Sequence, residues 1–288
     1  MADERIFDAE FYHKLNTFRM SMKMKLAAGM NGGRKSNAKG NSVEFSDFRE
    51  YILGDDIRRI DWNAYGRFDR LFVKLFMEEK EGLFRIFMDA SKSMDFGEHK
   101  KSICAQRIAG ALSYCVLENS DRLFLNVMQG NTLTEYKGVT GRQAFARTTD
   151  RLEQINFDGE ADLPACIKRA GIKQRGVSVI ISDFYTDRLE DILKYLTFNR
   201  QETVLIQVLS REEAEPELCG TLKLIDSETG KGMRITMGST LEREYKAGYQ
   251  GFTAGIDALA RKYSAAYLRV MSDESLDGIL FGTLGRLA

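Results

Sequence analysis

The sequence predicts an α/β fold: a Rossmann-like three-layer sandwich with a mainly parallel β-sheet, preceded by an N-terminal helical and loop extension. From residue 83 onward, strand-length apolar runs alternate with segments of helical periodicity, which is the pattern of a sheet covered by helices on both faces. The runs at residues 177–182 and 203–209 are apolar almost throughout, as is typical of central strands buried on both sides. Two acidic residues, Asp89 and Asp183, directly follow such runs.

Residues 1–80 are predicted to form the extension, and residues 81–288 the α/β domain. Apolar side chains recur at helical spacing over residues 4–28, which predicts an amphipathic helix. The glycine-rich segment 29–41 predicts a loop. A polar and aromatic segment over residues 43–80 completes the extension.

Strands and helices are then expected to alternate to the end of the chain. Turn residues between two pairs of short strands predict β-hairpins at 122–136 and 222–237. The predicted strands are residues 83–88, 122–128, 132–136, 177–182, 203–209, 222–225, 233–237 and 266–270. The predicted helices are residues 99–117, 142–155, 163–170, 188–198, 241–263 and 276–287.

The charge balance argues against functions that need an electric field over the whole molecule. The chain has 42 basic and 42 acidic residues, so it does not indicate binding of nucleic acid or of a membrane. Basic residues nevertheless gather between Lys14 and Lys39, where no acidic residue occurs. This strip is either the solvated face of a helix with its following loop, or a docking surface for an acidic partner or an anionic surface.

Cysteine and hydropathy patterns favour a soluble, cytoplasmic protein. The four cysteines are far apart and form no C-x-x-C pair, which favours free thiols in a reducing compartment. The two histidines offer little material for a histidine metal site or a Ser/His/Asp triad. The sequence shows no secretory signal and no apolar run of about 18 residues, so no membrane span is expected.

The polar residues after the first apolar run predict a metal site. Asp89, Ser91 and Ser93 form a D-x-S-x-S pattern between a strand and a helix. Carboxylate and hydroxyl oxygens suit Mg²⁺, and Asp183 at a second strand end can orient a bound water. A site with so few charged ligands favours an external carboxylate as its last ligand. The alternative interpretation is a helix cap and a turn.

A longer motif resembles the bacterial family of domain-of-unknown-function 58 proteins. Its pattern, F-x-x-x-R-x-Y-x-x-G-D-x-x-R-x-I-D-W, is followed in the family by an acidic residue, a strand and D-x-S-x-S. The acidic position corresponds to Glu78 or Glu79. The matching residues are Phe45, Arg49, Tyr51, Gly54, Asp55, Arg58, Ile60, Asp61 and Trp62.

The resemblance implies a von Willebrand factor A-like domain carrying a metal-ion-dependent adhesion site. It also implies a MoxR-type AAA+ ATPase as the protein partner. Many members carry two N-terminal membrane helices, and this chain resembles the short soluble form. A complete site of this kind has a threonine where Ala161 stands here, so the predicted Mg²⁺ site is incomplete at this position. The missing hydroxyl leaves one coordination position for water, or for Asp162 if the loop bends inward.

The motif residues also have a local interpretation. Arginines and aspartates at this spacing can form ion pairs, and Gly54 with Asp55 indicates a turn. The segment is then either a structural clamp that fastens the N-terminal arm to the sheet domain or a surface that binds a partner.

Three functions follow from these observations. The leading hypothesis is a non-catalytic protein-interaction adaptor that docks a partner carboxylate at the strand ends. The alternative is an Mg²⁺-dependent phosphoryl-transfer or hydrolytic enzyme using Asp89 and Asp183. Against it, Ser91 stands where such enzymes on this topology need a second acid, and no phosphate-binding glycine loop occurs. Nucleic-acid or membrane binding by the basic strip is the third.

Overall fold

The structure, a computed structural model, describes residues 5–18, 44–77, 82–216, 220–225 and 232–287. The chain divides into two compact units. Residues 25–81 form one, here called the hairpin unit; residues 1–24 and 82–288 form the other, the sheet unit. The division after residue 81 is close to the predicted boundary after residue 80. The first 24 residues, however, group with the sheet unit, whereas residues 1–80 were expected to form one extension.

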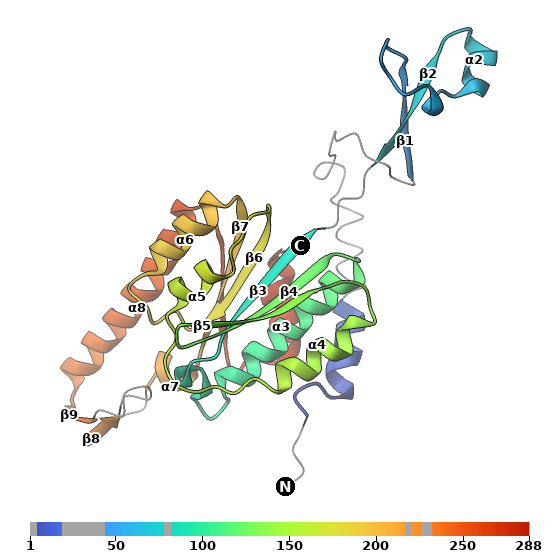
Figure 1. The fold of residues 1–288 in the computed structure, drawn as a ribbon. Coiled ribbons are helices and arrows are strands. Elements are labelled where there is room, and N and C mark those ends of the chain that lie inside the picture. Colours follow the sequence, from blue (N-terminus) through green and yellow to red (C-terminus); the bar gives the residue numbers. More distant parts are fainter. Residues whose placement is uncertain (1–4, 19–43, 78–81, 217–219, 226–231, 288) are drawn as a thin grey trace. The chain divides into compact units, whose positions relative to one another are not determined.

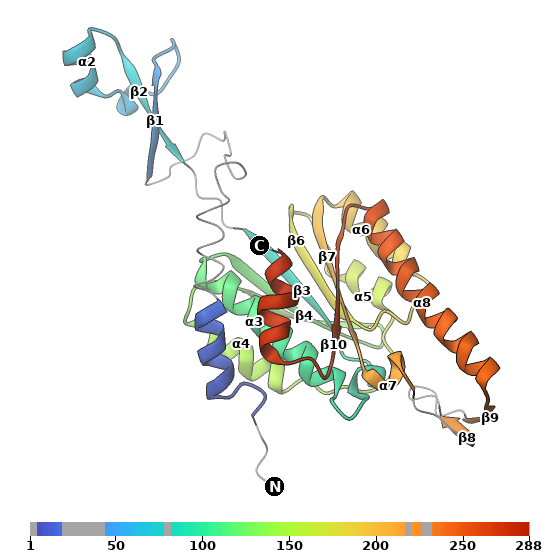
Figure 2. The same cartoon turned by 180° about the vertical axis from the view of Figure 1, so that it is seen from behind.

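The sheet unit is built on six strands in the order β10-β7-β6-β3-β4-β5 (Figures 1 and 2). All neighbours pair in parallel except β5, which pairs antiparallel with β4 through the predicted hairpin. The predicted mainly parallel sheet is thus confirmed. The strands are β3 (Leu83–Asp89), β4 (Arg122–Gln129), β5 (Thr132–Val139), β6 (Gly176–Ser182), β7 (Gln201–Leu209) and β10 (Ala266–Met271).

Side chains along the central strands point alternately into two helical layers, as the strand period of two requires. In β3, Ile86 and Met88 belong to one buried cluster and Phe87 to the other. Figures 1 and 2 show the layers on opposite faces of the sheet. One contains residues 9–18, α3 (Lys101–Glu118) and α4 (Ala144–Glu153); the other contains α5 (Leu163–Arg169), α6 (Leu189–Phe198) and α8 (Ser239–Lys262). This is the predicted three-layer sandwich.

The N-terminal helix belongs to the core of the sheet unit. Of the predicted helix at 4–28, residues 9–18 are helical and residues 19–28 lie outside the described residues, as does the predicted loop at 29–41. Phe7 and Phe11 are buried against α3 at Gly110, where a Cβ atom would lie 2.5 Å from the ring of Phe7. Glycine is therefore needed at this helix contact, because any larger residue would displace the aromatic ring.

The remaining elements of the sheet unit follow β7 and β10 along the chain. The predicted second hairpin forms from β8 (Gly220–Ile225) and β9 (Gly232–Met237), after the short helix α7 (Arg211–Ala214). At the C-terminal end, the single helix predicted at 276–287 is instead a π-helical turn, η3 (Gly278–Thr283), followed by a 3₁₀ turn, η4 (Leu284–Leu287). Leu280 and Leu284 are buried. The spacing of the apolar residues therefore predicted correctly which side chains pack in the core, but it did not predict the type of helical hydrogen bonding.

The hairpin unit consists of an antiparallel strand pair with two short helices in its connection. β1 (Glu44–Glu50) pairs with β2 (Phe72–Met77), and between them lie η1 (Ile57–Arg59) and α2 (Trp62–Phe68). Ile60, Asp61 and Val73 are buried. Neither β1 nor β2 was predicted, although the nearly continuous apolar run Phe72–Met77 is typical of a strand.

Two further expectations concern the chain as a whole. Cys104, Cys115 and Cys166 are free thiols, and burial raises the pKa of Cys104 to about 12, as expected for an unreactive core residue; Cys219 lies outside the described residues. Within the described ranges, no helix is long and apolar enough to cross a membrane.

Candidate functional site at the ends of strands β3 and β6

Parallel pairing brings the two predicted acids to the same edge of the sheet. β3 and β6 are neighbours in register, with Met88 opposite Ile181, so Asp89 and Asp183 both emerge at the carboxyl ends of their strands. They are only 3% and 2% exposed. Ser182 connects the two ends, because its hydroxyl donates to Oδ2 of Asp89 at 2.6 Å.

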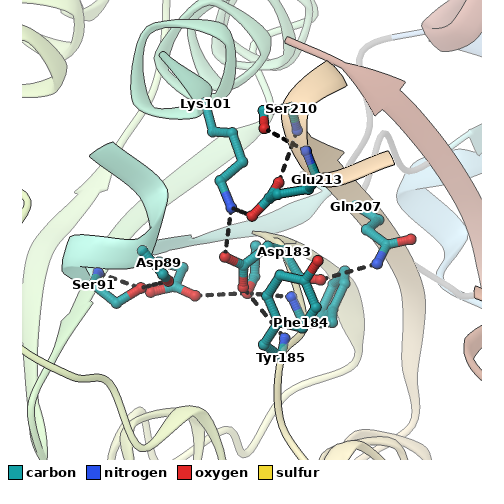
Figure 3. A network of polar contacts seen from close by, with 11 residues as sticks. Asp89, Ser91, Lys101, Asp183, Phe184, Tyr185, Gln207, Ser210 and Glu213 are labelled. Atoms are coloured by element: carbon teal, nitrogen blue, oxygen red, sulfur yellow. Dashed lines mark hydrogen bonds and ion pairs between the residues drawn. The ribbon is translucent and has the colours of Figure 1, made fainter. Parts of the chain in front are cut away.

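The loop after β3 gathers the predicted hydroxyls beside Asp89. Oδ1 of Asp89 accepts a hydrogen bond from the backbone N–H of Ser91 at 2.9 Å (Figure 3). The hydroxyls of Ser91 and Ser93 lie 3.0 Å apart at the start of η2 (Lys92–Asp95). The backbone N–H of Ala90 donates to Met128 of β4 at 2.9 Å, which anchors the loop to the sheet.

Asp89 is a buried carboxylate that lacks a cation. Burial first, and then the negative charge of Asp183, raise its pKa to about 6, against the hydrogen bonds from Ser182 and Ser91. In the part of the chain that the structure describes, Asp89 forms no ion pair. Its charge is therefore available to a cation bound from solution.

Asp183 has a cation of its own, which the sequence did not predict. The ammonium of Lys101, fully buried at the start of α3, lies 2.9 Å from Oδ2 of Asp183 and 2.6 Å from Oε1 of Glu213 (Figure 3). Burial lowers the pKa of Lys101, but the charges of Asp183 and Glu213 outweigh burial and raise it. Lys101 is therefore a fixed positive charge that links β6 to α7.

The loop after β6 is strained where it leaves the strand. Phe184 is buried and has φ +60°, in the left-handed region that bulky residues rarely adopt. The hydroxyl of Ser182 accepts from its N–H at 2.9 Å, and Gln207 donates to the carbonyl of Asp183 at 2.9 Å. These bonds hold the conformation that carries Asp183 and the half-exposed Tyr185 to the strand-end face.

The oxygen atoms of this loop fit Mg²⁺. Ligands about 2.1 Å from an octahedral Mg²⁺ lie about 3.0 Å from each other, and the two serine hydroxyls have this spacing. A carboxylate without a cation stands beside them. No cluster of three or more His, Cys, Asp or Glu side chains suited to a metal occurs among the described residues, so a cation here would depend on the hydroxyls. Asp89, Ser91 and Ser93 would be its ligands.

The loop that contains Ala161 lies between α4 and α5. The carboxylate of Asp162 in this loop contacts groups other than the predicted metal ligands. The loop lies against the residues after β3, since Asp158 N–H donates to Ala90 at 3.1 Å and Lys92 N–H to Gly159 at 2.8 Å. The carboxylate of Asp162 caps α5 through the N–H of Ala165 at 3.0 Å and pairs with Arg188 at 3.3 Å. No hydrogen bond between described residues joins it to Asp89 or the two serines.

Residues of the motif serve mainly to shape the hairpin unit. Oδ1 and Oδ2 of Asp55 each lie 2.9 Å from one guanidinium nitrogen of Arg49, and Oδ2 also accepts from Ile52 N–H at 3.0 Å. Gly54, at φ +105°, makes the turn between them. Asp61 caps α2 through Asn63 N–H at 2.9 Å and pairs with Lys74 at 3.4 Å.

Other motif residues are not clamped in this way. Trp62 is 65% exposed and has an edge contact with the ring of Tyr65. Arg58 is exposed, and its N–H donates to Asp56. Tyr51 is partly buried, and its N–H donates to Leu71. Phe45 lies in β1, opposite Phe76, while Glu78 and Glu79 fall outside the described residues.

Sequence reasoning missed Lys101, Ser182 and Glu213. Lys101 follows Lys100 in a charged stretch that looked solvated, and nothing in the sequence separates the two lysines. Ser182 ends an apolar strand directly before Asp183, a position that could have signalled a polar role. Glu213 is four residues beyond β7, in the sequence Ser-Arg-Glu-Glu that predicts a capping box with Ser210, which the structure contains.

Several known proteins resemble this chain. The uncharacterized proteins Rv1480 of Mycobacterium tuberculosis and Mb1516 of Mycobacterium bovis are each 26% identical to it over 280 residues, 93% of this chain and 87% of theirs. Among solved structures, BatB from Bacteroides thetaiotaomicron is 14% identical with a TM-score of 0.41, covering 69% of this chain and 93% of BatB. The SpRpn10 VWA domain is 13% identical with a TM-score of 0.40, covering 70% of this chain and 94% of that domain.

The family comparison covers most of the chain. Residues 47–252 match the family described as "Protein of unknown function DUF58". The match includes most of the motif in the hairpin unit, the Asp89–Ser93 loop and the Asp183 loop. This confirms the resemblance stated from the sequence, and the chain belongs to the DUF58 family.

Proposed function

We propose that this protein is a non-catalytic adaptor that docks a carboxylate of a protein partner at the strand-end face, through Mg²⁺ held by Asp89, Ser91 and Ser93. The single observation that supports this most is the pair of hydroxyls 3.0 Å apart beside a buried carboxylate without an ion pair. A bound Mg²⁺ would supply an electrophilic position for an outside oxygen ligand.

The proposed partner is a MoxR-type AAA+ ATPase, as the family resemblance implies. Asp183 has a supporting role, because Lys101 already occupies one of its oxygens. Asp162 is not needed as a ligand, since it caps α5 and pairs with Arg188.

The experiment is capture of a MoxR-type ATPase from the same organism by the immobilised full chain, with Mg²⁺ or with EDTA. We expect capture by the wild type in Mg²⁺ only, and none by Asp89→Ala. Asp150→Ala is the matched control, because Asp150 is an exposed carboxylate on α4 and belongs to neither of the loops that follow β3 and β6. Capture that persists in Asp89→Ala would contradict docking through the metal.

The same proteins test the enzymatic alternative. We expect no hydrolysis of p-nitrophenyl phosphate above the level of the Asp89→Ala variant. Hydrolysis by the wild type that is lost in this variant and kept in Asp150→Ala would instead support a phosphoryl-transfer or hydrolytic function.

A further inference from the structure

Charged side chains around the strand ends do not balance. Asp89 and Asp183 are buried carboxylates and Glu213 is a partly buried one; among the described residues, the ammonium of Lys101 forms ion pairs with Asp183 and Glu213. With all four groups ionised, two negative charges remain uncompensated. A divalent cation would make the group neutral.

The lysine charge is held in a fixed position. Glu213 is itself oriented by the capping box, in which its carboxylate accepts from Ser210 N–H at 2.8 Å. The aromatic rings of Tyr185 and Phe96 lie 5.6 Å and 6.0 Å from the ammonium. With a side chain that is 0% exposed, Lys101 has no room to turn toward solvent.

We propose that Lys101 determines the ligand preference of the docking site, by making the metal-loaded site neutral so that it accepts a carboxylate. This inference rests on the proposed function. Without Lys101, the loaded site would keep one negative charge and repel an anionic ligand. The lysine therefore lowers the affinity for the metal and raises the affinity of the loaded site for a carboxylate.

This role predicts opposite changes in two affinities. In Lys101→Met, which keeps a long unbranched side chain, Mn²⁺ should bind about tenfold more tightly, and acetate should bind the Mn²⁺-loaded site about tenfold more weakly. Glu213→Gln removes a negative charge and should shift both affinities the other way. Glutamine also serves in a capping box, so α7 should stay intact.

Water-proton relaxation with Mn²⁺ measures both affinities, because bound Mn²⁺ enhances relaxation and acetate displaces its water. The double variant Lys101→Met/Glu213→Gln restores the charge balance, so both affinities should return toward wild type. Lys100→Met is the matched control: Lys100 is half-exposed and pairs with Asp95, and its loss should change neither affinity.

The outcomes separate the two proposals. A purely structural role of Lys101 would weaken both affinities in Lys101→Met, with no recovery in the double variant, and would overturn the inference alone. If Lys101→Met does not fold, the Glu213→Gln variant tests the inference. If this variant binds Mn²⁺ as tightly as the wild type does, or more tightly, the inference is overturned. Wild-type protein that binds no Mn²⁺ would overturn the proposed function together with it.

Discussion

The hydroxyl of Ser182 donates to Asp89 at 2.6 Å and accepts from the N–H of Phe184 at 2.9 Å. One buried serine thus connects the end of β3 to the strained loop after β6. It is also an uncharged hydrogen-bond donor to the carboxylate of Asp89, which forms no ion pair among the described residues.

We expect Ser182→Ala to destabilise the protein by about 1–3 kcal/mol, because it leaves a buried N–H and a buried carboxylate oxygen without this partner. Urea unfolding followed by circular dichroism measures the loss. Ser113→Ala is the control: its buried hydroxyl donates only to the Ala109 carbonyl, which is already bonded within α3. Equal losses in the two variants would show that the bridge has no special role.

Metal-free stability should depend on the ionisation of Asp89. Burial and the charge of Asp183 raise its pKa to about 6, so the folded state holds this proton more tightly than the unfolded state. Its contribution to stability therefore falls as the pH rises from about 4 to about 6.

Compared with Asp89→Asn, the wild type should lose on the order of 2 kcal/mol across that range. Urea unfolding in EDTA at a series of pH values tests this. Parallel pH profiles of the two proteins would contradict it.

Restoring the hydroxyl that the family pattern has at Ala161 should strengthen metal binding. The Ala161 loop is hydrogen-bonded to the residues after β3 on both sides of Ser91, so a threonine there would add an oxygen near the serines. We expect Ala161→Thr to bind Mg²⁺ about tenfold more tightly by calorimetry. Ala161→Val has the same shape without the hydroxyl and should not gain affinity. A gain in both variants would point to packing instead.

Glu190 joins α6 to α8 in a pH-dependent way. It accepts from Lys262 at 2.7 Å and from Tyr263 at 2.8 Å, and these bonds hold its pKa near 2. The lowered pKa means that this contact stabilises the fold above the ordinary pKa of glutamate and is lost as the pH falls toward 2.

Glu190→Gln should therefore melt below the wild type at pH 7, with a difference that shrinks in acid. Glu202→Gln, at an exposed pair with Arg175, should melt as the wild type does at both pH values. A Glu190→Gln difference that stays constant with pH would refute the assignment.

The Arg49–Asp55 pair should hold the turn that presents Ile52 and Leu53. Asp55→Asn weakens the ion pair and the bond to Ile52 N–H, so the turn should open more often. Limited chymotrypsin digestion, read by mass spectrometry, should show faster cleavage after Leu53. Glu50→Gln, in an exposed pair with Arg70, is the control and should be cleaved like the wild type. Unchanged cleavage in Asp55→Asn would argue against the clamp.

The sequence by itself determined the order of strands and helices in the sheet unit, the D-x-S-x-S loop and the family. These features depend on neighbours along the chain: alternating apolar runs specify buried strands, and the end of a strand specifies where Asp89 and Asp183 emerge. The motif likewise predicted a turn at Gly54, since glycine followed by aspartate is a local turn signal.

Only the tertiary structure decided the chemistry of the site. Lys100 and Lys101 are identical and adjacent, yet one is half-exposed and the other fully buried. The difference arises because Lys101 meets Asp183 and Glu213, which lie 82 and 112 positions away. Asp162 was a conditional ligand, dependent on an inward bend of its loop; in the structure its carboxylate instead accepts from the N–H of Ala165 and pairs with Arg188. Local sequence patterns cannot predict ion pairs between residues so far apart in the sequence, because the packing of α3 against β6 and α7 brings these residues together.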